Sequence, residues 1–420
     1  MTEIDVRPEE LRDLAALFAP GHVDDPYPLY AQWRARRPVA RPHEHLFVLS
    51  RHDDCAAVLA DPAFGHAPAS AVNPLRAALR PSASRAPGAG NAPDHGVFAE
   101  VNARSMLRMN PPDHARLRRL VSGAFTPARV RELVPRVEAI TGELVGDLGS
   151  RFDVIGQLAL PLPVRVISEL LGIPEADRPR LVTWSEQLSR SLDPGFLLPP
   201  DVRATMRVAR DGFHDYLGAL IPERRRNPGG DLVSGLVQVH DDDGRLTEVE
   251  IITTCRLLLI AGHETTRSLI GGGVLALLRN PVQLAAARSD PGLMDRCVEE
   301  VLRHDPPVQL LVRSALEEAK IGGVVVPAGA TVLMLVGAAN RDEVLGDHPD
   351  AFDITRGPRR HLAFGHGIHF CLGAPLARVE AAIALRHLVP LLPRCQIAEP
   401  PEWKPHTVLR GLEHLWLTTA

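Results

Sequence analysis

The chain has no long apolar run. No stretch reaches the about 18 consecutive apolar residues that a membrane-spanning helix needs, and the N-terminal segment MTEIDVRPEE is polar and acidic. A secretory signal would instead carry an apolar core near the N-terminus. We therefore expect a soluble, cytoplasmic protein with no membrane partner.

Cysteine and lysine are both scarce. The five cysteines are an odd number and are spread over the whole chain, at Cys55, Cys255, Cys297, Cys371 and Cys395. Without a secretion signal a disulfide framework is not expected, so a cysteine with a special role would be a ligand or a nucleophile. Lysine occurs only as Lys320 and Lys404, yet arginine brings the cations to 47 against 51 anions. This balance does not indicate nucleic acid as a partner.

Apolar residues at helical spacing cover much of the chain, whereas alternating strand patterns are few and short. Helices are predicted at 126–148 and 162–173. The strand candidates are a hairpin at 39–51, a Gly- and Pro-punctuated segment at 319–337, and a segment near 405–418. The sequence predicts a mainly α fold, with a small sheet beside a large helical mass.

The longest predicted helix begins at Thr247, where Thr-x-x-Glu with Glu250 forms a capping box. It runs to about Arg279, before an Asn-Pro pair. A helix of about 32 residues is roughly 48 Å long and would cross the whole molecule. Its middle carries the segment AGHETT, residues 261–266.

The segment AFGHGIHFCLG, residues 363–373, sets two histidines and a cysteine among glycines. His366, His369 and Cys371 are three possible zinc ligands, but their spacing matches no common zinc module and no fourth ligand lies nearby in sequence. A buried cysteine in a glycine-rich turn is a second interpretation. A thiolate ligand is the third.

The residues after Cys371 favour the thiolate. They form a helix pattern with Pro375 in its first turn, so Cys371 lies at a helix N-terminus, where amide groups and the helix dipole lower the pKa of a thiol. Such a thiolate can serve as an axial ligand of haem iron. Gly365, Gly367 and Gly373 fit this interpretation, because a flat macrocycle against the backbone leaves no room for Cβ atoms.

These residues resemble a known motif. The pattern F-G-x-G-x-H-x-C-x-G is the haem-binding loop of the cytochromes P450, and its positions are filled by Phe364, Gly365, Gly367, His369, Cys371 and Gly373. The chain is similar to the soluble bacterial class I members over nearly its whole length. The resemblance implies the cytochrome P450 fold as a single domain over 1–420, haem b with Cys371 as the iron ligand, and a monomeric monooxygenase.

A second motif matches the family's E-x-x-R pair. Glu300 and Arg303 lie on one helix face in EEVLRHDPP, and the resemblance implies that they form a buried, structural ion pair. In the family an arginine before the haem loop often joins them. Here Ala351 stands at the expected position, and Arg356 is offered as the third partner only as a guess.

Four cations match the residues that hold the haem propionates in the family. His114 and Arg118 are one helical turn apart in the segment 110–127, so both can reach the same propionate. Arg313 and His369 match the other propionate partners. The resemblance therefore implies that all four bind the cofactor.

The segment AGHETT resembles the oxygen-activating part of the family's central helix. Ala261 and Thr265 share a helix face, Gly262 relieves crowding, and Thr265 with Glu264 matches the alcohol–acid pair that delivers protons to dioxygen. A threonine in mid-helix also bonds the carbonyl four residues earlier, whether or not it is catalytic. His263 points about 100° away from the residues of this helix that are expected to face the haem, so we expect it to pack or to form hydrogen bonds.

The resemblance also implies separate electron-transfer partners. No fused reductase or ferredoxin domain is expected, so electrons would come from a ferredoxin and its reductase. Arg116 and Arg119 are expected to be solvated surface cations. Together with Arg359 and Arg360 they lie close in sequence to the haem motifs, where they could attract a small acidic iron–sulfur protein.

In the family, substrate specificity resides in segments that correspond here to about 66–108, to 188–202, to the surroundings of Leu310, and to those of Leu409. These segments are mostly apolar, although the first contains arginines, so we expect O2 and a largely apolar organic molecule as substrates, hydroxylated or epoxidised in secondary metabolism. Part of the first segment, 81–95, is predicted to be a long mobile loop. Two alternatives are a haem-thiolate sensor or carrier and a variant that uses peroxide directly; Thr265 argues against both.

Overall fold

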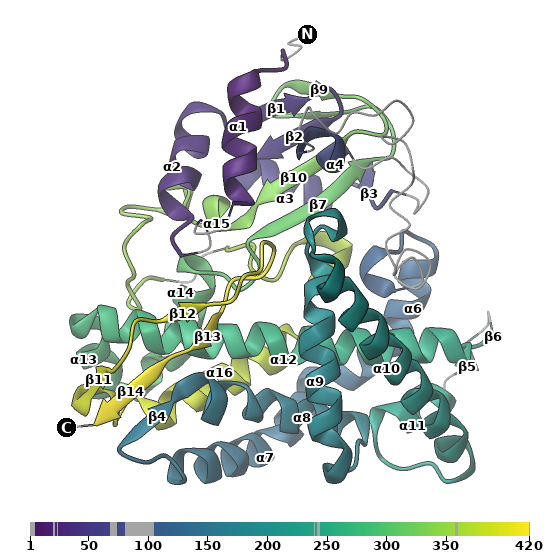
Figure 1. The fold of residues 1–420 in the computed structure, drawn as a ribbon, viewed down its shortest axis with the longest axis vertical. Coiled ribbons are helices and arrows are strands. Elements are labelled where there is room, and N and C mark those ends of the chain that lie inside the picture. Colours follow the sequence, from purple (N-terminus) through teal and green to yellow (C-terminus); the bar gives the residue numbers. More distant parts are fainter. Residues whose placement is uncertain are drawn as a thin grey trace.

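A computed structural model describes residues 5–19, 22, 24–67, 74–79, 105–238, 240–241, 244–357 and 360–419. The predicted loop at 81–95 and Arg359 lie outside these residues. Helices form most of the described structure, and the largest sheet lies at one end beside α1 and α2 (Figure 1). The prediction of a mainly α fold with a small β region is confirmed.

The α-helices are α1 (Pro8–Leu17), α2 (Tyr27–Arg36), α3 (His52–Ala60), α4 (Pro74–Leu79), α6 (Asp113–Ser122), α7 (Pro127–Gly146), α8 (Pro161–Leu171), α9 (Arg178–Ser189), α10 (Pro200–Arg226), α11 (Leu232–Gln238), α12 (Glu248–Arg279), α13 (Pro281–Ser289), α14 (Met294–His304), α15 (Val336–Ala339) and α16 (Ala374–Leu388). The strands are β1 (Val39–His43), β2 (Leu46–Leu49), β3 (Phe64–Gly65), β4 (Arg151–Asp153), β5 (His240–Asp241), β6 (Gly244–Arg245), β7 (Leu310–Ala315), β8 (Ala319–Ile321), β9 (Val324–Val326), β10 (Thr331–Leu335), β11 (Cys395–Ile397), β12 (Glu402–Trp403), β13 (Leu412–His414) and β14 (Trp416–Thr419).

The largest sheet has the strand order β1-β2-β10-β7-β3. The hairpin predicted at 39–51 is β1 and β2, and the segment 319–337 forms β8, β9 and β10. Side chains alternate between the two faces of a strand, and in β2 and β10 both faces are buried: Phe47 and Val332 join one apolar cluster, Val48 and Leu333 another. These strands are therefore continuous apolar runs.

The C-terminal segment forms smaller sheets. The strand predicted near 405–418 is two strands, β13 and β14, which begin only at Leu412. β13 pairs with β12, while β14 lies between β11 and β4. The stretch 404–411 between β12 and β13 is therefore a long turn, and it contacts the central helix.

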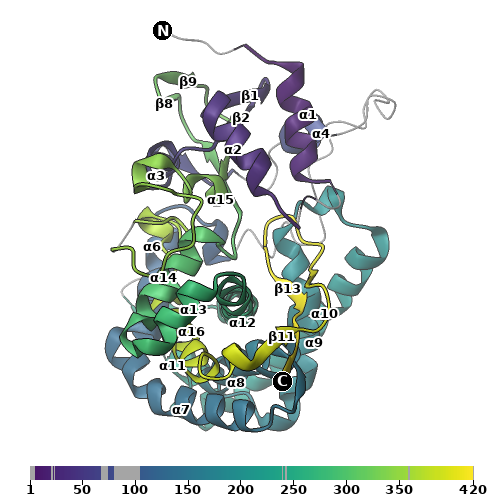
Figure 2. The same cartoon turned by 90° about the vertical axis from the view of Figure 1, so that its left-hand side faces the viewer.

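The predicted central helix is confirmed as α12, with 32 residues, the capping box at Thr247, and an end before Pro281. Figure 2 looks along α12, with helices arranged around it. Most of its side chains from Ile251 to Leu277 are buried, which is typical of a core helix. Ala261 is an exception, since it is exposed in the middle of this buried stretch. Within the described ranges, no single helix has both the length and the hydropathy to cross a bilayer.

The cluster around Glu300 is confirmed, including its guessed member. Arg303 donates from Nε and Nη2 to the Glu300 carboxylate over 2.7 and 2.8 Å, and both side chains are buried. Arg303 also donates to the carbonyls of Asn340, Pro349 and Ala351. Arg356 donates from Nε to Glu300 over 3.2 Å and completes the cluster. One carboxylate thus ties the loop around 347–356 to α14.

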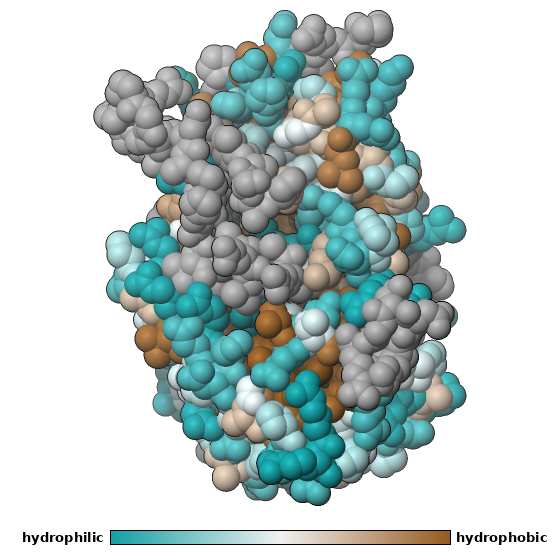
Figure 3. Space-filling model, turned by 90° about the vertical axis from the view of Figure 1, so that its right-hand side faces the viewer, coloured by the Kyte–Doolittle hydropathy of each residue, from teal (hydrophilic) through white to brown (hydrophobic). Residues whose placement is uncertain are grey.

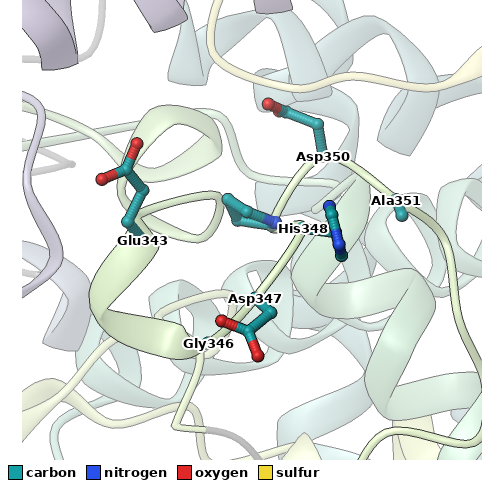
Figure 4. A pocket seen from close by; sticks show the side chains of 7 residues that line it. Glu343, Gly346, Asp347, His348, Asp350 and Ala351 are labelled. Carbon is teal, nitrogen blue, oxygen red and sulfur yellow. The ribbon is translucent and has the colours of Figure 1, made fainter.

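The same loop borders a polar hollow (Figure 4). The hollow is lined by Glu343, Gly346, Asp347, His348, Pro349, Asp350 and Ala351. In the part of the chain that the structure describes, no group of three or more His, Cys, Asp or Glu side chains is placed to hold a metal ion. The hollow is therefore a surface feature of the loop that Arg303 and Arg356 hold.

Replacing Arg303 by alanine is expected to lower the free energy of unfolding by about 3–5 kcal/mol, because it removes the main partner of a buried carboxylate. A matched control is Arg386→Ala, whose pair with Glu138 spans 3.0 Å with both side chains more than a third exposed. We expect that control to cost less than about 1 kcal/mol. Urea denaturation followed by circular dichroism measures both. Equal costs would contradict the structural role of the buried cluster.

Candidate active site

The loop 363–373 needs glycine at two positions. Gly365 and Gly367 have φ angles of 70° and 68°, in the left-handed region that side chains disfavour. A Cβ on Gly367 would lie 2.2 Å from the carbonyl oxygen of Leu59 at the end of α3. The Cys371 amide donates to the Phe364 carbonyl over 2.9 Å and closes the loop. The loop thus lies tightly against α3, with Cys371 at its end.

The environment of Cys371 combines burial with hydrogen-bond donors. The backbone amides of Gly373 and Ala374, at the start of α16, act to lower the pKa of its thiol, as expected at a helix N-terminus. The predicted lowering of its pKa is nevertheless wrong for the protein chain alone. Burial raises the pKa of the thiol by more than the two amides and the nearby Arg118 and Arg378 lower it. A coordinated metal ion reverses this balance, because a thiol that binds a metal is deprotonated.

A cluster of three histidines and the buried Arg313 lies beside this loop. The His369 ring is 4.1 Å from the His114 ring and 5.1 Å from the His66 ring, centroid to centroid. Within the described part of the chain, Nε2 of His66 and of His114 is buried without a hydrogen-bond partner. Arg313 is 8% exposed and donates from Nη1 to the neighbouring Val312 carbonyl over 2.9 Å. Among the described ion pairs, none neutralises Arg313.

The pKa values show that burial disfavours the charged forms of these side chains. Burial, helped by the charge of Arg313, lowers the pKa of His66 to about 2 and that of His369 to about 3. Burial also lowers the pKa of Arg313 to about 10. A buried cation without an anion is unfavourable, and carboxylates that accept charge-assisted hydrogen bonds would compensate it. The two propionates of a haem fit this cluster.

His66 is a member of the cluster that the sequence did not indicate. No local motif marks it, because its position depends on strand pairing: β3 pairs with β7, with Gly65 opposite Ser314. That register places His66 next to the strand that carries Arg313. Only the long-range pairing of these strands could have revealed it.

Helix α6 borders the same loop. Arg118 donates from Nη2 to the Phe370 carbonyl over 2.6 Å, while His114 is buried against His369. Both residues therefore face the loop, and that they reach the same propionate stays a prediction. The expectation that Arg116 is a free surface cation is wrong, because it forms a 2.8 Å ion pair with Glu250 at the start of α12. That pair requires the two helices to be adjacent, which the local sequence does not show.

The predicted hydrogen bond of Thr265 is confirmed. Its hydroxyl donates to the Ala261 carbonyl over 2.7 Å, four residues earlier on α12. A Cβ on Gly262 would lie 3.5 Å from Ile167 of α8, which is an ordinary contact. The packing of α8 therefore does not by itself require the glycine that was predicted to relieve crowding.

Glu264 is fully buried and surrounded by cations. Its Oε1 accepts from Lys404 Nζ over 2.7 Å, and its Oε2 lies 3.6 Å from His263 Nε2 and 3.9 Å from Arg267. Burial alone would raise the pKa of Glu264, but Lys404, His263 and Arg267 together lower it to about 2. The carboxyl group is thus ionised at neutral pH. Lys404 was not predicted here, since 140 residues separate the two.

His263 has the hydrogen-bonding role expected of it. It is fully buried, and its Nδ1 lies 2.8 Å from the Leu259 carbonyl and 3.2 Å from the Ser185 hydroxyl of α9. It therefore faces α9 on the outer side of α12 and helps to fix that helix.

A cysteine at a helix N-terminus, next to a buried arginine that no described ion pair neutralises, is an arrangement suited to a haem with a thiolate ligand. The comparison with known proteins agrees. The cytochrome P450 family model matches residues 286–415. The cytochrome P450 monooxygenase PikC of Streptomyces venezuelae is 41% identical over 404 residues, which are 93% of this chain and 90% of PikC.

Two further comparisons cover the whole chain or nearly so. The nocardicin C N-oxygenase of Nocardia uniformis subsp. tsuyamanensis is 39% identical over 431 residues, 100% of both chains. The crystal structure of ligand-free CYP164A2 from Mycobacterium smegmatis has a TM-score of 0.86 at 41% identity and covers 97% of this chain and 100% of that one. The chain therefore belongs to the cytochrome P450 family. It is a monooxygenase that binds haem b.

Replacing Gly367 by alanine is expected to lower both the haem content and the free energy of unfolding. The backbone strain alone lowers the free energy of unfolding by about 1–3 kcal/mol. The added Cβ would also meet the Leu59 carbonyl. Gly357→Ala is a matched control on a nearby loop, because a Cβ there meets nothing within 4 Å. The haem-to-protein ratio and the thermal unfolding midpoint measure the effect. Normal haem content in the Gly367 variant would show that the loop does not need this backbone conformation.

Proposed function

We propose that this cytochrome P450 hydroxylates or epoxidises a largely apolar organic molecule in secondary metabolism, with electrons from a separate ferredoxin and its reductase. The observation that carries the proposal is the pair of Thr265 and Glu264 on α12, one hydrogen-bonded to the Ala261 carbonyl and the other buried and ionised. A haem-thiolate sensor or carrier would need neither side chain.

The proposed roles of the residues follow from their contacts. A haem held by Cys371 would supply the chemistry of oxygen activation. His66, His114, Arg118, Arg313 and His369 are proposed to hold its propionates. The exposed Ala261 leaves space beside α12 for oxygen. Its carbonyl fixes the hydrogen of the Thr265 hydroxyl, so that the oxygen of this hydroxyl can accept a further proton.

Glu264 is proposed to receive a proton from solvent and to pass it to the oxygen of the Thr265 hydroxyl. As that proton arrives, the hydroxyl's own hydrogen leaves the Ala261 carbonyl and goes to the oxygen being reduced. The carboxylate returns to its ionised form after each transfer. Because it is ionised at rest, it cannot act as a stored acid and must be reloaded each time.

The apolar nature of the substrate is supported by the surfaces near the proposed site. Val312 and Leu316, within and just after β7, are 42% and 48% exposed, although strands usually bury such residues. The face seen in Figure 3 shows hydrophobic side chains gathered between hydrophilic ones, as at an entrance for an apolar ligand. The nocardicin relative, an N-oxygenase by name, is consistent with secondary metabolism.

Replacing Thr265 by alanine is expected to divert consumed oxygen to hydrogen peroxide and to lower product formation by up to about 10²-fold, because the proton path loses its last hydroxyl. Thr265→Ser keeps the hydroxyl and serves as the control. The substrate is first found as the compound, from a panel of macrolides, terpenoids, steroids and fatty acids, that converts the haem iron from low to high spin. Unchanged coupling in the alanine variant would exclude this role for Thr265.

Ferredoxin docking is proposed at the exposed side chains of Arg119 and Arg360, near α6 and the haem loop. Arg119→Glu is expected to slow reduction by ferredoxin roughly 10-fold at low salt and to weaken its salt dependence. Arg207→Glu on α10 is the control, because it reverses an exposed charge on another element. Stopped-flow formation of the ferrous CO complex measures the rate. Equal slowing by both variants would place docking elsewhere.

A further inference from the structure

Lys404 reaches the core of the molecule from the C-terminal hairpin. It is 6% exposed and donates from Nζ to Glu264 over 2.7 Å. The hairpin can approach α12 this closely because Gly411, whose carbonyl accepts from the Lys404 amide, has no side chain. A Cβ on Gly411 would lie 2.1 Å from the Ser268 hydroxyl, one turn after Glu264. Lys404 is thus placed by backbone packing against α12.

The next residues of the hairpin are tied to the connection between α9 and α10. Asp193 of that connection accepts three hydrogen bonds at Oδ1, from the Thr407 amide, the Thr407 hydroxyl and the Val408 amide, over 2.9, 2.9 and 3.0 Å. Its Oδ2 lies 3.0 Å from Arg190 Nε. A buried carboxylate with this many partners holds the turn 404–408 firmly to the connection.

His406 lies between the two anchors. It is 6% exposed, and both Asp193 and Glu264 act on its charge, as do Lys404 and Arg190. The amide of His406 donates to the Lys404 carbonyl over 2.8 Å, which folds the turn back on itself. Five residues therefore join the ion pair on α12 to the α9–α10 connection in one compact structure.

We propose that Lys404 is a positioning residue of the monooxygenase reaction: it holds the Glu264 carboxylate in place, and the turn 404–408 makes this hold depend on the α9–α10 connection through Asp193. The inference rests on the proton-delivery role proposed above for Glu264. Lys404 keeps the Glu264 carboxylate ionised and fixed beside α12, so that the proton which Glu264 passes on has to come from solvent in each cycle.

The lysine content of the chain allows a direct measurement. Lys320 on β8 is exposed, whereas Lys404 is buried, and the chain contains no other lysine. Protein labelled with 15N at lysine Nζ, in the diamagnetic ferrous CO form, is expected to show one slowly exchanging ammonium signal. It should vanish in Lys404→Met and in Glu264→Gln, persist in Lys320→Met, and shift or weaken in Asp193→Ala.

Catalytic measurements test the same inference. Lys404→Met is expected to keep haem content and substrate affinity, but to lower the fraction of electrons recovered in product by on the order of 10-fold and to change the solvent isotope effect, because Glu264 loses its position. Lys404→Arg should restore coupling, and Lys320→Met should not change it. Asp193→Ala should alter coupling in the same direction as Lys404→Met.

The outcomes separate this inference from the proposed function. Uncoupling in Glu264→Gln together with normal coupling in Lys404→Met would overturn the role of Lys404 and leave proton delivery by Glu264 in place. Normal coupling in both would overturn the proposed role of Glu264 itself. An ammonium signal and coupling that Asp193→Ala leaves unchanged would overturn the link to the α9–α10 connection. A fall in thermal stability without a changed isotope effect would reduce Lys404 to a structural residue.

Discussion

Polar side chains on a buried helix need hydrogen-bonding partners. In the middle of α12 these partners come from the helix itself and from the segments packed against it. The hydroxyls of Thr265, Thr266 and Ser268 donate hydrogen bonds to carbonyls of the helix itself. Longer side chains cannot do so. Glu264 accepts a hydrogen bond from Lys404, and Arg267 donates to the carbonyls of Leu412 and Glu413. The C-terminal hairpin is thus held against α12 by Arg267 and by Glu264, which the proposed chemistry also needs, so the fold and the site share one of these contacts.

Two buried charge clusters near the proposed site are balanced in opposite ways. Around Glu264, the cations Lys404 and Arg267 and the ring of His263 surround one carboxylate, and the result is a stable anion within the protein. Around Arg313, histidines and guanidinium groups gather with no acidic partner among the described residues, and burial drives their pKa values down. The first cluster is complete without a ligand, whereas the second gains its anions only from a ligand. This difference separates the residue proposed to relay protons from the residues proposed to bind the haem propionates.

Sequence reasoning succeeded where function depends on neighbours along the chain. The capping box of α12 and the hydrogen bond of Thr265 follow from spacings of a few residues, and the buried pair of Glu300 and Arg303 follows from a family motif of the same length. It failed where strands or hairpins bring distant segments together. His66 reaches Arg313 through the pairing of β3 with β7, and Lys404 reaches Glu264 through a hairpin that packs on α12. The pKa of Cys371 was predicted in the wrong direction because the dipole of α16 is visible in the sequence and burial is not.

The Glu300 cluster shows why a motif can change at one position and still work. The carboxylate has to be neutralised because it is 4% exposed, and Arg303 is fixed by the helix that both share. The third cation has no such constraint. The loop around 347–356 turns back on itself, so an arginine five positions after Ala351 can reach the same oxygen and also bond the carbonyls of Asp347 and His348. What the fold requires is a guanidinium at that point in space, and the length of the loop decides which residue number provides it.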